Sequence, residues 1–220
     1  AKLVVSRTIA IAGMVSIVLT GPLAAQAVGA DITAAVATTS VAHDGGVTTV
    51  TTTNIQGATA FNQFDSFNVG TGLTANVIQP SSTAALVNII DGGGASVIDG
   101  TLNAQIQTAT GAEVGGNHFY VNRDGFVVSG TGTINAGQLT LSTPTQNVID
   151  GLKRNAQGLG SSALANLFAG TEGLNPAADI HILGTINARR LELRAGARLL
   201  MDGTITVEDT GGTGGRVTPA

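Results

Sequence analysis

The stretch Gly132-Thr-Ile-Asn-Ala136 returns unchanged as Gly184-Thr-Ile-Asn-Ala188. A near copy is Gly100-Thr-Leu-Asn-Ala104, and Gly203-Thr-Ile-Thr-Val207 is a weaker one. Successive copies begin 32, 52 and 19 residues apart. Recurrence of one short segment is typical of proteins that stack similar structural units along an axis.

Short strands flank these copies. Apolar residues alternate with polar ones in Leu139-Thr-Leu141, Ile180-His-Ile182 and Leu191-Glu-Leu193, which is the pattern of strands with one buried face. Asp-Gly pairs recur at residues 91–92, 99–100, 124–125 and 202–203, and we expect them to supply left-handed backbone at tight corners. The 19-residue interval matches one circuit of a solenoid, so the spacing predicts an all-β fold, a parallel β-helix.

The longer intervals require insertions, which we place at residues 105–116 and 145–175. In the second, Val148, Ile149 and Leu152, and then Leu164, Leu167 and Phe168, have helical spacing. A short helical insertion outside the solenoid is therefore expected. A β-sandwich of hairpins would also explain the alternation and the turns, but it gives no reason to repeat the same five residues.

Residues 61–69 carry Phe61, Phe64, Phe67 and Val69, and we expect them to cap the N-terminal end of the stack. Asparagines recur near strand ends, where they can bridge backbone groups or stack as a ladder. They are Asn62, Asn68, Asn88, Asn103, Asn122, Asn135 and Asn187.

Residues 1–27 have the features of a secretory signal peptide. Lys2 and Arg7 precede an apolar run at residues 9–19, and Ala25-Gln-Ala27 resembles a cleavage site. A buried helix or a short membrane anchor is the alternative, although the run is too short to span a bilayer. The chain has no Cys. Either export through a second membrane disfavours disulfides, or the core needs no such crosslinks.

The composition excludes several classes of protein. With 31 Gly, 29 Thr and only 11% charged residues, the chain is neither a coiled coil nor a charge-driven disordered protein. Its net charge of −4 and scattered basic residues predict no nucleic-acid partner. His43, His118 and His181 fit no metal-binding pattern, and we expect each at the surface. No cofactor or catalytic motif is recognised, and the aspartates of the Asp-Gly pairs are expected to serve turns rather than a polysaccharide lyase.

Six segments, in order, resemble the N-terminal secretion domain of two-partner secretion exoproteins, the filamentous-haemagglutinin-like adhesins. The segments are residues 64–69, 79–82, 85–88, 96–104, 117–125 and 137–143. The resemblance implies a right-handed parallel β-helix over residues 28–220, as the N-terminal part of a larger exoprotein. It further implies a likeness between Asn122-Arg-Asp-Gly125 and an Asn-Pro-Asn-Gly motif, and between residues 62–68 and an Asn-x-x-Asn motif at altered spacing.

The resemblance also implies a function. It predicts a secreted or surface-exposed monomer of a Gram-negative bacterium that is recognised by the periplasmic domains of a cognate outer-membrane β-barrel transporter. The mature chain would have no integral membrane segment. The candidate recognition residues are Asn62, Asn68, Asn88, Asn122 and Gly125. The alternative is a β-helical polysaccharide-binding or polysaccharide-lyase domain.

Overall fold

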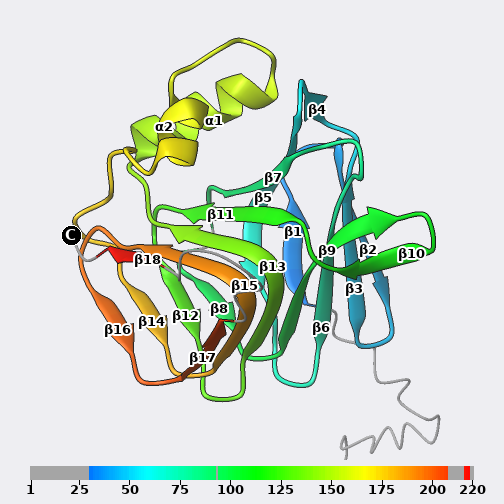
Figure 1. Ribbon diagram of the computed structural model, residues 1–220, viewed down its shortest axis with the longest axis vertical. Coiled ribbons are helices and arrows are strands. Elements are labelled where there is room, and N and C mark those ends of the chain that lie inside the picture. Colours follow the sequence, from blue (N-terminus) through cyan, green and yellow to red (C-terminus); the bar gives the residue numbers. More distant parts are fainter. Residues whose placement is uncertain (1–29, 93, 208–215, 219–220) are drawn as a thin grey trace, which may run out of the picture.

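The computed structural model describes residues 30–92, 94–207 and 216–218, so the signal peptide expected at residues 1–27 lies outside the described residues. The expected all-β fold is confirmed: short strands form a large, mostly parallel sheet and a smaller parallel sheet, with two short helices (Figure 1). The strands are β1 Asp31–Ala34, β2 Thr39–Asp44, β3 Val47–Thr52, β4 Ile55–Gln56, β5 Thr59–Asn68, β6 Thr74–Gln79, β7 Ala85–Ile90, β8 Ser96–Ile98, β9 Thr101–Thr108, β10 Gly111–Val114, β11 Asn117–Asn122, β12 Phe126–Val128, β13 Thr133–Ser142, β14 Ile180–Ile182, β15 Thr185–Arg194, β16 Leu199–Met201, β17 Thr204–Val207 and β18 Arg216–Thr218. The helices are α1 Gln146–Ala156 and α2 Ala163–Ala169.

Strand pairing creates three faces. Face A contains β2, β3, β6, β9 and the first halves of β13 and β15, followed by β17. Face B contains β1, β5, β7, β11 and the second halves of β13 and β15, followed by β18. The small sheet β8-β12-β14-β16 is face C. Faces A and B belong to one sheet because β13 and β15 are each long enough to contribute to both.

The repeated pentapeptide lies at the same position in successive layers of face A. Asn103 pairs with Asn135, and Asn135 pairs with Asn187, all in parallel register. Their side-chain amides form a continuous ladder that begins at Asn76, and each later Nδ2 donates to the Oδ1 of the preceding asparagine over 2.9 Å. An asparagine ladder is therefore confirmed for Asn103, Asn135 and Asn187, and the inner amides of Asn103 and Asn135 each supply both a donor and an acceptor to their neighbours.

The glycine that opens each pentapeptide is required by close contact between layers. A Cβ at Gly100, Gly132, Gly184 or Gly203 would overlap a backbone carbonyl oxygen of the neighbouring layer. The expected left-handed backbone is present at Gly125, with φ of 108°, but the expectation is wrong for Gly100 and Gly203, which lack a positive φ. At these two positions glycine is needed for lack of space rather than for its conformational freedom.

Antiparallel strands cover the N-terminal end of the stack. β1 pairs with β5, and β2 pairs with β3. Phe61, Phe64 and Phe67 are all buried, but they divide between two clusters of the core. Phe64 and Phe67 join the main core enclosed by the three faces, whereas Phe61 lies on the outer side of face B.

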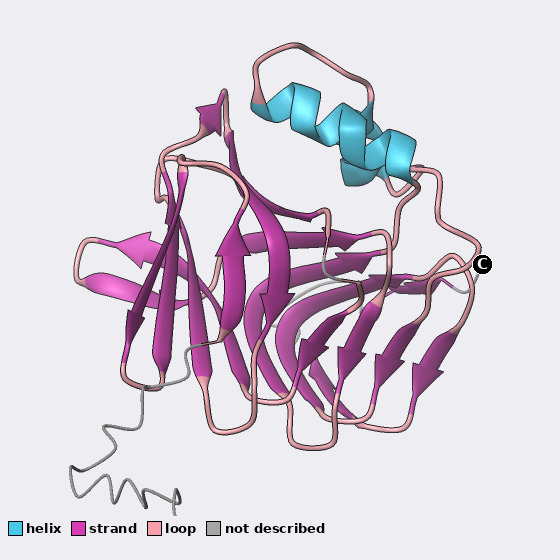
Figure 2. Cartoon of the chain, turned by 180° about the vertical axis from the view of Figure 1, so that it is seen from behind, coloured by secondary structure: helices cyan, strands magenta, loops and turns pink. Residues whose placement is uncertain are grey.

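The helical insertion covers the outer side of face B (Figure 2). Ile149 and Leu152 of α1 and Leu167 of α2 pack on Phe61 and its neighbours, as their helical spacing predicts. Helix α2 ends at Ala169 and is followed by Gly170, whose left-handed conformation is a common helix terminator. The other expected insertion, at residues 105–116, is the β9–β10 hairpin, which projects from the stack.

Both sides of β11 are buried, and the expectation of a surface position for His118 is wrong, because His118 faces the main core together with Tyr120. His118 is fully buried, 2.9 Å from the carbonyl oxygen of Gln105 through Nε2. Burial lowers the pKa of His118 to about 4. Its ring stacks with that of Tyr120 in the main core, while Phe119 points outward under α2.

Candidate functional site

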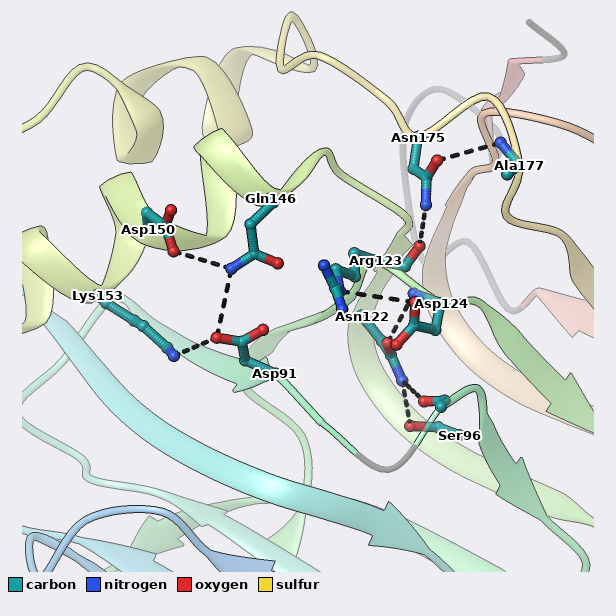
Figure 3. Close-up of polar contacts among 11 residues, drawn as sticks. Asp91, Ser96, Asn122, Arg123, Asp124, Gln146, Asp150, Lys153, Asn175 and Ala177 are labelled. Carbon is teal, nitrogen blue, oxygen red and sulfur yellow. Dashed lines mark hydrogen bonds and ion pairs between the residues drawn. The ribbon is translucent and has the colours of Figure 1, made fainter.

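The turn at residues 122–125 joins β11 to β12 and is held by the side chain of Asn122 (Figure 3). Nδ2 of Asn122 donates to the carbonyl oxygen of Gly94 over 2.9 Å and to Oγ of Ser96 over 3.0 Å. Its Oδ1 accepts a bond of 2.9 Å from the backbone N–H of Asp124. Asn122 is fully buried, and only an amide supplies two donors and an acceptor in this arrangement.

The next layer of the stack closes over the same turn. Nδ2 of Asn175 donates to the carbonyl oxygen of Arg123 over 2.6 Å. A Cβ at Gly125 would lie 2.5 Å from the carbonyl oxygen of Asp179. The turn is thus enclosed between Gly94 and Ser96 on one side and residues 175–179 on the other.

Only the tip of the turn reaches solvent. The side chains of Arg123 and Asp124 are 43% and 34% exposed and lie 3.6 Å apart as an ion pair. These are the two positions at which the chain departs from the Asn-Pro-Asn-Gly motif. The positions that match the motif, Asn122 and Gly125, are buried.

Asn68 lies beside this turn through contacts with strand β8. Its Oδ1 accepts a bond of 2.8 Å from the backbone N–H of Val97, and its Nδ2 donates to Asp31 over 3.0 Å. The neighbouring residue Ser96 bonds to Asn122 through Oγ and to the carbonyl oxygen of Gly125 through its backbone N–H. The structure therefore brings three of the candidate residues together around the start of β8.

Asn62 and Asn88 form a separate, fully buried pair. They lie opposite one another on β5 and β7, and Nδ2 of Asn62 donates to Oδ1 of Asn88 over 3.0 Å. Asn68 lies six positions after Asn62 along β5, which is roughly 20 Å of extended strand. The five candidate residues thus form two groups.

A polar cluster at the end of β7 fixes helix α1 near the turn. Nζ of Lys153 forms an ion pair with Asp91, and Nε2 of Gln146 donates to Asp150 over 2.8 Å (Figure 3). Partial burial acts to raise the pKa of Asp91, but the neighbouring Lys153 ammonium outweighs it and holds this pKa below its ordinary value. Asp91 is therefore a structural anion.

A buried ion pair fixes α2, and sequence reasoning missed it. Nη1 of Arg194 lies 2.9 Å from Oε1 of Glu172 and donates to the carbonyl oxygen of Leu167 over 2.6 Å. Oγ of Ser142 donates to the same Glu172 oxygen over 2.6 Å. Burial acts to lower the pKa of Arg194, but Glu192 and Glu172 outweigh it and raise this pKa. Nothing in the local pattern indicates that these residues meet.

The geometry does not favour a catalytic centre. Asp91 and Asp124 follow β7 and β11, whereas Asp99 and Asp202 follow β8 and β16, the outermost strands of face C. Within the described residues, no group of three or more His, Cys, Asp or Glu side chains could hold a metal ion.

In the same part of the chain, none of the helices has both the length and the apolar character needed to cross a membrane.

Comparison with known families adds a separate finding. A sequence model described as the TPS secretion domain matches residues 27–216. No curated protein matches the chain. The matched range includes the turn at residues 122–125 and both asparagine groups.

Proposed function

The chain belongs to the TPS secretion domain family, and from this premise we propose that residues 28–220 are the N-terminal targeting domain of a large exported adhesin. TPS domains direct the two-partner secretion of exoproteins across the Gram-negative outer membrane, which agrees with a secreted or surface-exposed product. The proposed partner is a cognate β-barrel transporter with periplasmic recognition domains. Residues 1–27 would be the signal peptide of the exported protein. The exported domain would be a monomer without a cofactor.

We also propose that the three faces form a right-handed parallel β-helix with an N-terminal cap. The chain visits face C, face A and face B in that order, as in β8, β9 and β11, and again after the insertion in β14 and the two halves of β15. Corresponding strands pair in parallel with their counterparts in the next layer. The antiparallel strands β1 and β2 would be the cap.

The burial of the candidate recognition residues is the observation that carries the proposal. Asn62, Asn88, Asn122 and Gly125 are enclosed in the folded domain, and Asn68 is partly enclosed. A transporter could read these side chains only before the layers close. We therefore propose that it binds the unfolded chain, as extended segments added to the edge of a sheet, where backbone bonds give affinity and side chains give specificity.

Export of the chain tests the transporter requirement. The 220-residue chain is expressed in a two-membrane bacterium with and without the barrel protein, and the culture supernatant and periplasm are compared. We expect the chain outside the cell only when the barrel is present. Retention in the periplasm beside a working barrel would contradict the proposal.

Asn122→Ala tests recognition by the buried turn. The change removes three hydrogen bonds and should cost about 1–3 kcal/mol of folding free energy. If the transporter reads Asn122, export should fall more than this loss explains. Asn175→Ala is the matched control, because it disturbs the same turn from the next layer. Export and urea unfolding are measured for both variants, and an equal loss of export at equal stability would reduce Asn122 to a structural role.

A further inference from the structure

A hollow of about 320 Å³ lies on the outer side of face B beside α2. Its floor is a row of three polar residues on adjacent strands: Asn117 of β11 pairs with Gln138 of β13, which pairs with Arg190 of β15. Adjacent strands are about 4.8 Å apart, so the row presents three hydrogen-bonding groups at regular intervals. The hollow is distinct from the turn at residues 122–125, none of whose residues lines it.

The polar row has no partners within the described part of the chain. The side chains of Asn117, Gln138 and Arg190 make no hydrogen bond or ion pair to any described residue, although the backbone N–H groups of Asn117 and Gln138 are bonded. The other charged residues of the hollow are engaged, because Arg194 pairs with both Glu192 and Glu172. Among the charged residues that line the hollow, Arg190 is therefore the cation that is available to bind a ligand.

Two aromatic side chains lie beside this polar row. Phe168 of α2 is 43% exposed, and its ring centroid lies 5.0 Å from that of Phe119 in the floor. Both rings line the hollow. An exposed aromatic ring offers an apolar contact surface, whereas the neighbouring amides can both donate and accept hydrogen bonds.

We propose that this hollow binds a short carbohydrate that carries a carboxylate. The guanidinium of Arg190 matches a carboxylate through two parallel hydrogen bonds. The amides of Asn117 and Gln138 suit ring hydroxyls, and the ring of Phe168 suits the C–H face of a sugar. The volume is at the lower end of the range for small-molecule sites, which limits the ligand to one or two sugar units.

This site would exist only after export. Its wall comes from α2, and its floor comes from three strands that are far apart in the sequence, so the unfolded chain cannot form it. The proposed transporter signal, in contrast, must be accessible in the unfolded chain. Failure of the carbohydrate proposal would therefore leave the secretion proposal intact, and the reverse also holds.

Titration of the purified chain with digalacturonate, and with uncharged cellobiose as the control sugar, tests the proposal. We expect digalacturonate to bind, and Arg190→Gln to weaken binding at least about tenfold because it removes the charged partner. Arg189→Gln is the matched control, since it makes the same change at the adjacent residue, which is exposed but lines a different hollow. Phe168→Ala should also weaken binding, whereas Leu159→Ala, at another exposed apolar residue of the insertion, should not.

Calorimetry gives the affinities, and the NMR signals of the Asn117 and Gln138 side-chain amides report whether the ligand reaches the row. The proposal is overturned if digalacturonate does not bind, or if cellobiose binds equally well. It is also overturned if Arg189→Gln weakens binding as much as Arg190→Gln does.

Discussion

At the residue scale, His118 makes the stability of the domain depend on pH. Its imidazole is buried beside Tyr120, lies 2.9 Å from the carbonyl oxygen of Gln105 through Nε2, and has no hydrogen-bond partner at Nδ1 among the described residues. Burial lowers its pKa from 6.5 to about 4, so the folded state holds it neutral while the unfolded chain takes up a proton below pH 6.5.

The stability contributed by neutral His118 is thus fully present above pH 6.5 and is lost as the pH falls towards 4. We expect the free energy of unfolding to drop by about 3 kcal/mol over this interval. Urea unfolding at a series of pH values measures it, and His118→Gln should flatten the curve between these limits. The loss from Asp91 belongs at lower pH, because its pKa is below the ordinary carboxyl value. An unchanged slope in His118→Gln would contradict the assignment.

His118 is also an example of a feature that the sequence does not predict. The ladder of Asn103, Asn135 and Asn187 could be predicted, because a repeat places its members at one position in successive layers. The burial of His118 could not, because the insertion also buries Phe119 and Val121 on the outer side of β11, so the sequence shows no alternation that would tell which side faces the core. In the candidate site, the turn at Asn122 was identified from its motif, but its burial depends on Gly94 and on residues 175–179, which no local pattern connects to it.

At the element scale, the helical insertion depends on the ion pair between Glu172 and Arg194. Glu172→Ala would leave the Arg194 guanidinium, which is almost fully buried, with Glu192 as its remaining acidic partner. Removing one member of a buried pair typically costs about 3–5 kcal/mol. We expect α2 to lose protection in hydrogen exchange before the strands do. Arg198→Met is the control, because its ion pair with Asp179 is exposed and solvent screening should leave it a small contribution. Equal effects of the two changes would show that burial does not set the strength of the Glu172 pair.

At the scale of the whole molecule, the layers contact one another through backbone as well as side chains, and the pentapeptide glycines sit at these contacts. A methyl group at Gly132 would overlap the carbonyl oxygen of Ile98 in the preceding layer, and neither backbone can move without disturbing the strand pairs on faces A and C. Overpacking of this kind typically costs about 1–3 kcal/mol.

Gly132→Ala should therefore lower the urea midpoint of the whole domain in a single transition, since the misfit lies between layers rather than in a loop. Gly130→Ala is the matched control two residues away, where a Cβ meets no atom within 4 Å and φ is not left-handed. It should change stability by no more than about 0.5 kcal/mol. If both substitutions are equally mild, the layers must be able to separate by the width of a methyl group, and close backbone contact would no longer explain why each copy of the repeat begins with glycine. If only Gly132→Ala destabilises the domain, the repeat records a packing constraint that acts on every layer.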